Sequence, residues 1–155
     1  LVVTTAQHAP LLEKLLPLRR RIARVALRLT PGSLLEIIKL RKGKTVGILS
    51  YSKRFGDLMA RTCSEYTEEV QLLPPRVFSP ELDMQAFLKD KDAVLVPKGY
   101  EKYCSGETAK MLDRFGGKLI ACSYELDEGS FLYLKEKTKR LLEEKTGGSH
   151  DGPGI

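Results

Sequence analysis

The sequence predicts an α/β fold, built as one three-layer domain with a mostly parallel sheet of five or six strands and helices on both faces. Short apolar runs alternate along the chain with segments whose apolar residues recur at helical spacing. The clearest unit is residues 45–63, where a buried strand leads through a polar turn into a helix. A parallel sheet joined by right-handed crossovers is the economical arrangement for such an alternation.

Each predicted element follows from its own local pattern. Residues 93–97 form a continuous apolar run, which is typical of a strand buried on both faces. Ser33 with Glu36 predicts a capping box, and Ser79 before Pro80 predicts another helix start. The predicted strands are 1–5, 22–29, 45–50, 69–73, 93–97 and 118–124; the helices are 9–16, 34–40, 53–63, 81–88, a segment ending near Phe115, and 131–144. Flavodoxin-like and periplasmic-binding-like proteins have this organisation.

Length and composition limit the class of protein. The 155 residues are enough for one domain with its own core, predicted over residues 1–146, with a flexible glycine-rich tail over 147–155. No apolar run has the length of a membrane helix and no signal peptide is recognisable, so we expect a cytoplasmic protein without a membrane partner. The chain starts with Leu rather than Met. We therefore expect it to be processed or cut from a longer protein.

The net charge of +6 is spread along the chain. Its densest basic run is Arg19-Arg20-Arg21, continued by Arg24 and Arg28. A solvated basic face is the favoured interpretation, and contact with phosphate or a partner is the alternative. No aromatic residues interleave with this run, so it offers no stacking platform for single-stranded nucleic acid.

Polar residues follow the predicted strands and suggest a ligand site. Parallel strands end at one edge of a sheet, where open α/β sheets bind their ligands. Hydroxyls, a lysine and a helix N-terminus there predict a pocket for an anion. Polar turns and simple helix capping are an equally weighted alternative. The predicted ligand-binding residues are Thr4, Thr5, Ser50, Tyr51, Ser52, Arg54, Phe55, Lys98 and Tyr124, with Thr30 and Ser123 at the same predicted edge.

No catalytic, cofactor or metal site is predicted. The chain lacks a glycine-rich dinucleotide fingerprint, a phosphate-binding loop and a nucleophile elbow. Its three cysteines, Cys63, Cys104 and Cys122, have neither disulfide-framework nor zinc spacing, and no His is placed to serve a catalytic thiol. We therefore expect a protein that is not an enzyme and has no cofactor.

Three stretches resemble a known family: VTTAQHAPLLEKLLPL, TPGSLLEIIKLRKGKTVGILSYSKRFGDLM and DAVLVP. They are similar to the C-terminal effector domain of GntR-type winged-helix bacterial transcription regulators. The resemblance covers nearly the whole chain, to about Glu144. It implies a domain that senses a small-molecule effector and dimerises, with DNA contacted only through an N-terminal winged helix outside this chain.

Two other functions stay open at this point. One is a stand-alone α/β domain that binds a small molecule with no link to DNA. The other is an enzyme with an unidentified nucleophile, for which Cys104 is the first candidate because it lies in a turn-like stretch.

Overall fold

The computed structural model describes residues 1–5, 8–16 and 21–147. The chain folds into two compact units. The central unit is Leu29–Ser123, and the terminal unit combines Leu1–Arg28 with the segment from Tyr124 onward. The single domain expected over residues 1–146 stays a prediction, and each unit is described by itself below.

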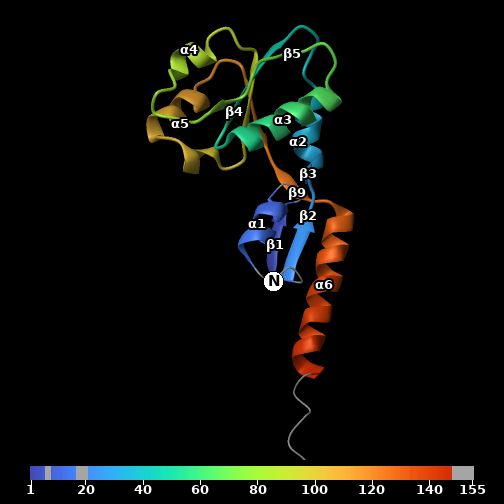
Figure 1. The fold of residues 1–155 in the computed structure, drawn as a ribbon. Coiled ribbons are helices and arrows are strands. Elements are labelled where there is room, and N and C mark those ends of the chain that lie inside the picture. Colours follow the sequence, from blue (N-terminus) through green and yellow to red (C-terminus); the bar gives the residue numbers. More distant parts are fainter. Residues whose placement is uncertain (6–7, 17–20, 148–155) are drawn as a thin grey trace, which may run out of the picture. The chain divides into compact units, whose positions relative to one another are not determined.

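A five-stranded parallel sheet forms the centre of the central unit (Figure 1). Its order is β5-β4-β7-β8, and β6 also pairs with β4. Every pair in it is parallel, as the sequence predicts. The α/β class and the mostly parallel sheet are thus confirmed. The strands are β4 (Thr45–Ser50), β5 (Gln71–Leu72), β6 (Arg76–Val77), β7 (Ala93–Pro97) and β8 (Lys118–Cys122).

Helices cover both faces of this sheet because its inner strands are apolar on both sides. All five residues of β7 are buried. Val94 and Val96 belong to a core cluster with Phe87 of α4 (Met84–Leu88) and Leu112 of α5 (Gly106–Asp113). On the other face, α2 (Pro31–Ile38) contacts β8 and α3 (Lys53–Tyr66), and α3 contacts β4. This is the predicted three-layer arrangement.

Side-chain caps fix where these helices begin. Thr30, Ser52, Asp83 and Ser105 each accept a hydrogen bond from a backbone N–H in the first turn of α2, α3, α4 and α5. Two predicted starts are wrong. α2 begins before Ser33, whose hydroxyl instead accepts a hydrogen bond from the Ser123 N–H at 2.9 Å. The Ser79 hydroxyl bonds Glu81, and α4 begins only at Met84.

The terminal unit has its own sheet. β1 (Val2–Thr5) pairs in parallel with β2 (Ile22–Val25), and α1 (Ala9–Leu15) joins them. The strand predicted over residues 22–29 is interrupted at Ala26, whose N–H donates to the Ser130 hydroxyl at 2.8 Å. β3 (Leu27–Leu29) therefore forms a separate pair with β9 (Tyr124–Leu126).

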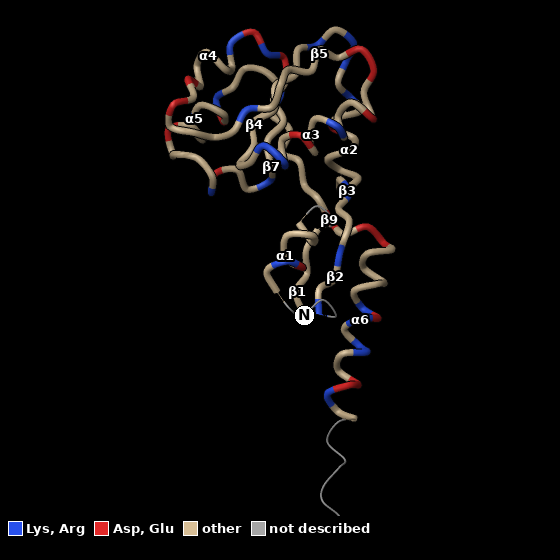
Figure 2. The backbone as a smooth tube through the Cα atoms, viewed as in Figure 1, with Lys and Arg blue, Asp and Glu red and all other residues tan. Residues whose placement is uncertain are grey.

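The last helix, α6 (Glu128–Gly147), contacts β2. Its Lys137 ammonium donates to the Ile22 carbonyl at 2.6 Å. Figure 2 shows basic and acidic positions alternating along α6, and no residue of this helix is buried. Of the predicted glycine-rich tail, residues 148–155 lie outside the described part, as do Arg19 and Arg20 of the basic run.

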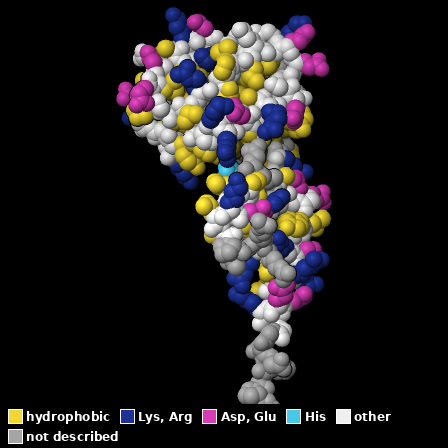
Figure 3. All heavy atoms as spheres, in the orientation of Figure 1, with side chains coloured by type: hydrophobic (Ala, Val, Ile, Leu, Met, Phe, Trp, Pro, Cys, Tyr) yellow, Lys and Arg dark blue, Asp and Glu magenta, His cyan; other side chains and the backbone are white. Residues whose placement is uncertain are grey.

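Charged groups of both signs are also interspersed over the visible face of the central unit (Figure 3). Within residues 1–5, 8–16 and 21–147, no helix is both long enough and apolar enough to cross a membrane.

Candidate functional site at the carboxyl edge of the central sheet

The turn after β4 is held by its own serines. Ser50 is fully buried, and its hydroxyl donates to the Ser52 carbonyl at 3.0 Å and accepts from the Ser52 N–H at 3.3 Å. The Ser52 hydroxyl in turn accepts from the Phe55 N–H at 3.2 Å and caps α3. These bonds point the N-terminus of a 14-residue helix at the carboxyl edge of the sheet.

Three aromatic rings gather at this turn. The Tyr51 ring stacks on Phe55 with centroids 4.8 Å apart and lies 4.6 Å from the ring of Tyr103. Tyr51 is 41% exposed and Tyr103 49% exposed, so the group is open to solvent. We call Tyr51, Phe55 and Tyr103 the aromatic cluster. Partial burial, and secondarily Tyr103, raises the pKa of Tyr51, so its hydroxyl stays protonated at neutral pH and can donate a hydrogen bond.

The turn after β7 brings further groups to the same edge. The Lys98 N–H donates to the Cys122 carbonyl at 2.9 Å. The Lys98 side chain is exposed just beyond the end of β7. Gly99 follows with φ of 75°, a conformation that favours glycine. It reverses the chain into the 3-10 helix η2 (Tyr100–Tyr103), and this helix carries Tyr103 to the ring of Tyr51.

A cavity of about 730 Å³ includes Tyr103 in its wall. Lys102, Cys104 and Ser105 line one part of it, and Phe78 and Ser79 line another. The Phe78 N–H donates to the Ser50 carbonyl at 2.8 Å, which ties this wall to the end of β4. The volume lies within the range of small-molecule sites, about 300–1,000 Å³.

The surroundings of Cys104 in this cavity favour its thiol form over the thiolate. Burial raises its pKa, and the carboxylates of Glu101 and Asp113 raise it further. The thiol is therefore protonated at neutral pH, whereas a catalytic cysteine needs the thiolate. Cys122 is more strongly affected, because burial raises its pKa to about 12. In the described residues, no three His, Cys, Asp or Glu side chains are grouped to hold a metal ion.

The structure brings together only part of the predicted site. Ser50, Tyr51, Ser52, Arg54, Phe55 and Lys98 belong to the ends of β4 and β7 or to the first turn of α3. Placing Thr4 and Thr5 in the same sheet is wrong, because β1 pairs with β2 and not with the central strands. Tyr124 follows the carboxyl end of β8 by two residues but begins β9, which pairs with β3, so its part in the site stays a prediction.

Tyr103 is the site residue that sequence reasoning missed. A glycine two positions after a buried strand, followed by aromatic residues, was the available signal. Whether Tyr103 reaches the site depends on the direction of the turn at Gly99, and no local pattern specifies that direction.

The parallel sheet, with helices on both faces and a capped helix after its central strand, defines a Rossmann-like α/β protein. The chain belongs to the YmtS Rossmann-like domain family, whose model matches residues 47–145. That match begins inside β4 and ends inside α6. Neither the search of curated proteins nor the search of solved structures returned a match. The segment after β4 reads Ser50-Tyr51-Ser52, so the glycine fingerprint of dinucleotide-binding members of this fold is missing there.

Proposed function

We propose that this chain is the effector-binding and dimerising domain of a bacterial transcription regulator of the GntR type. Its effector would be a small anion bound at the carboxyl edge of the central sheet. The observation that carries the ligand-binding part is the contact of the Tyr51 ring with both Phe55 and Tyr103, directly beside the N-terminus of α3.

The groups at this edge suit an anion with a flat or apolar part. The helix N-terminus offers a positive dipole end, and the exposed Arg54 and Lys98 offer full positive charges. The hydroxyls of Tyr51 and Tyr103 are donors for carboxylate or phosphate oxygens. The exposed ring of Tyr51 would cover the apolar part of the ligand.

The regulator assignment rests on the resemblance of the three stretches named above. In the proposed mechanism, the effector binds one arrangement of two protomers better than the other. Its binding shifts the population towards that arrangement and changes how two winged helices meet their half-sites on DNA.

An exposed apolar face supports dimerisation. Phe131 and Leu142 of α6 are 58% and 60% exposed, and their spacing of three helical turns puts them on one side of the helix. Light scattering across a concentration series checks this part, and Phe131→Ser should lower the dimer fraction. A chain that stays monomeric at all concentrations would contradict the dimer.

The experiment on the ligand is a thermal-shift screen against small carboxylates and sugar phosphates, followed by calorimetric titration of each hit. Arg54→Ala, Lys98→Ala and Tyr51→Ala should each weaken binding while circular dichroism stays unchanged. Lys110→Ala and Tyr66→Ala are matched controls, because these side chains are exposed elsewhere on the central unit. Unchanged affinity in both Arg54→Ala and Lys98→Ala would reject the site.

A second candidate function is a stand-alone small-molecule-binding domain with the same ligand site. Sequencing the codons immediately upstream of Leu1 distinguishes the regulator domain from the stand-alone binding domain. A coding segment for a winged helix supports the regulator, whereas a start codon directly upstream rejects it and leaves the binding site intact. The third candidate, an enzyme that uses Cys104, is disfavoured by the raised pKa of that thiol.

A further inference from the structure

A second cavity of about 850 Å³ lies at the amino edge of the central sheet. Its walls are the segments that enter three parallel strands. Leu40, Arg41 and Lys44 precede β4, and Lys91 with Asp92 precedes β7. Phe115 to Gly117 precede β8. Parallel strands start at the opposite edge from the one where they end, so this cavity is distinct from the aromatic cluster.

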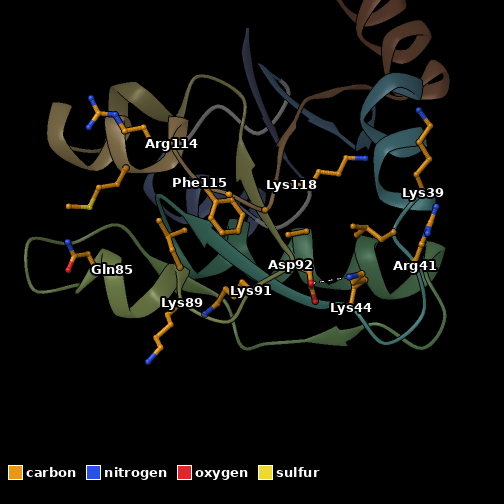
Figure 4. Close-up of a pocket in the computed structure, with 16 residues that line it drawn as sticks. Lys39, Arg41, Lys44, Gln85, Lys89, Lys91, Asp92, Arg114, Phe115 and Lys118 are labelled. Carbon is orange, nitrogen blue, oxygen red and sulfur yellow. Dashed lines mark hydrogen bonds and ion pairs between the residues drawn. The ribbon is translucent and has the colours of Figure 1, made fainter.

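The cavity is strongly cationic, and we call it the basic cavity. Asp92 is the acidic residue in its lining, beside seven basic ones: Lys39, Arg41, Lys44, Lys89, Lys91, Arg114 and Lys118. Figure 4 shows Phe115 near the middle, with Arg114 and Lys89 on one side and Lys44, Lys39 and Arg41 on the other. In this view the charged ends of Arg114 and Lys89 point away from Phe115, so the positive charges lie around the cavity and not against the ring.

Two carboxylates neutralise only part of this charge. Asp92 accepts the Thr45 N–H at 2.8 Å and bonds Lys44 at 3.2 Å, and these bonds lower its pKa. Glu36 pairs with Lys118 at 2.7 Å and with Lys39 at 3.0 Å. Both lysines together hold the pKa of Glu36 at about 2.

The remaining cations have no carboxylate partner in the part of the chain that the structure describes. This applies to Arg41, Lys89 and Arg114, and Lys91 bonds only the Phe87 carbonyl and lies over the Phe87 ring.

Helix ends explain some of these positions but not all. Lys39, Lys89 and Arg114 are the C-cap residues of α2, α4 and α5, where a cation favours the helix dipole. The Lys91 ammonium also bonds a helix end, the Phe87 carbonyl of α4, whereas Arg41 lies beyond α2 with no such contact in the described residues. Seven basic side chains thus line one cavity beside the single carboxylate of Asp92, and this excess of positive charge points to an anionic ligand.

Apolar side chains also line the basic cavity. Leu40, Leu88 and Met111 line it together with Phe115. A Cβ atom added to Gly117 would come within 2.5 Å of Phe115 Cζ, so the ring lies tightly against the backbone at Gly117. Cations and apolar side chains in one lining suit an organic molecule that carries several phosphate groups, since each phosphate can bond a separate Lys or Arg.

We propose that the basic cavity binds a small polyphosphorylated organic molecule, at a site separate from the carboxyl-edge effector site. The volume of the cavity fits a molecule of that size. This proposal does not depend on the proposed function, because the aromatic cluster, Arg54 and Lys98 do not line the basic cavity. The 730 Å³ cavity beside Tyr103 shares Gln85 and Met111 with it.

The test is calorimetric titration of the chain with inorganic tripolyphosphate at low salt. The double variant Arg41→Gln with Arg114→Gln should weaken the affinity by about tenfold or more, because two charge-assisted contacts are lost. The matched control is Arg61→Gln, an exposed arginine of α3 outside the cavity lining, and its affinity should stay close to that of the parent. Thermal unfolding of each variant verifies the fold.

Three outcomes would overturn the proposal. The first is no binding to the parent chain, and the second is an equal loss in Arg61→Gln, which would indicate unspecific attraction. The third is a loss in Arg54→Ala without a loss in the double variant. That result would show that tripolyphosphate binds at the carboxyl edge, and it would not reject the proposed effector site. Displacement of bound tripolyphosphate by a nucleoside triphosphate, and not by duplex DNA, supports a small ligand over nucleic acid.

Discussion

The rings of Tyr51 and Tyr103 lie 4.6 Å apart and join the turn after β4 to the 3-10 helix after β7. The two residues are far apart in the sequence, and only the pairing of β4 with β7 brings their turns together. This contact defines the carboxyl edge of the central sheet as one surface.

The first prediction concerns the energy of that contact. In a double-mutant cycle with Tyr51→Ala and Tyr103→Ala, we expect a coupling of about 0.5–1.5 kcal/mol in the free energy of unfolding, as for other aromatic pairs. Urea denaturation measures it. Tyr66, near the other end of α3, replaces Tyr103 in the control cycle, which should be additive within about 0.5 kcal/mol. A coupling equal to that of the control would show that the stacking contributes nothing.

The second prediction separates helix capping from ligand binding at Ser52. Ser52→Ala removes the cap of α3 and should cost about 1 kcal/mol of stability, whereas Ser52→Asp keeps a capping oxygen and should retain most of it. The added negative charge should nevertheless weaken anion binding at this edge. Ser64→Ala, an exposed site on the same helix, is the control for stability. Unaltered anion affinity in Ser52→Asp would show that the anion does not bind at the N-terminus of α3.

The third prediction is that the free energy of unfolding depends on pH through Tyr100. Burial raises its pKa from 10.0 to about 12, and the hydrogen bond that its hydroxyl donates to Asp113 at 2.8 Å adds to the shift. The folded state thus holds a proton that the unfolded state releases near pH 10. The stability from this group is complete below pH 10 and is lost as the pH rises from 10 to about 12.

Urea unfolding at a series of alkaline pH values checks this dependence. Asp113→Asn should lower the pKa of Tyr100, because the negative charge that opposes the phenolate is gone, and the loss of stability should then depend less on pH. Tyr100→Phe should remove this component altogether. If Tyr100→Phe has the same alkaline profile as the parent, another group is responsible.

The fourth prediction uses two adjacent glycines. A Cβ at Gly117 would lie 2.5 Å from Phe115 Cζ and 2.6 Å from the Asp92 carbonyl oxygen, so Gly117→Ala should destabilise the protein by about 1–3 kcal/mol. Gly116 has open space around its Cβ position, and Gly116→Ala should change stability by less than about 0.5 kcal/mol. Thermal and urea unfolding compare the two variants, and similar values would mean that the Phe115 ring adjusts without cost.

Local patterns were sufficient to predict the α/β class and the buried strands at residues 45–50 and 93–97, because their apolar runs are short and continuous. They were also sufficient for the polar turn at Ser50 to Ser52 and the cap of α3, since short-range hydrogen bonds hold both.

Which strands share a sheet could not be predicted in this way, because strand pairing joins segments that are distant along the chain. β1 pairs with β2 rather than with the central strands, so Thr4 and Thr5 are not in the sheet that carries Ser50. The Tyr51–Tyr103 contact and the basic cavity likewise exist only once the strands of the central sheet have paired.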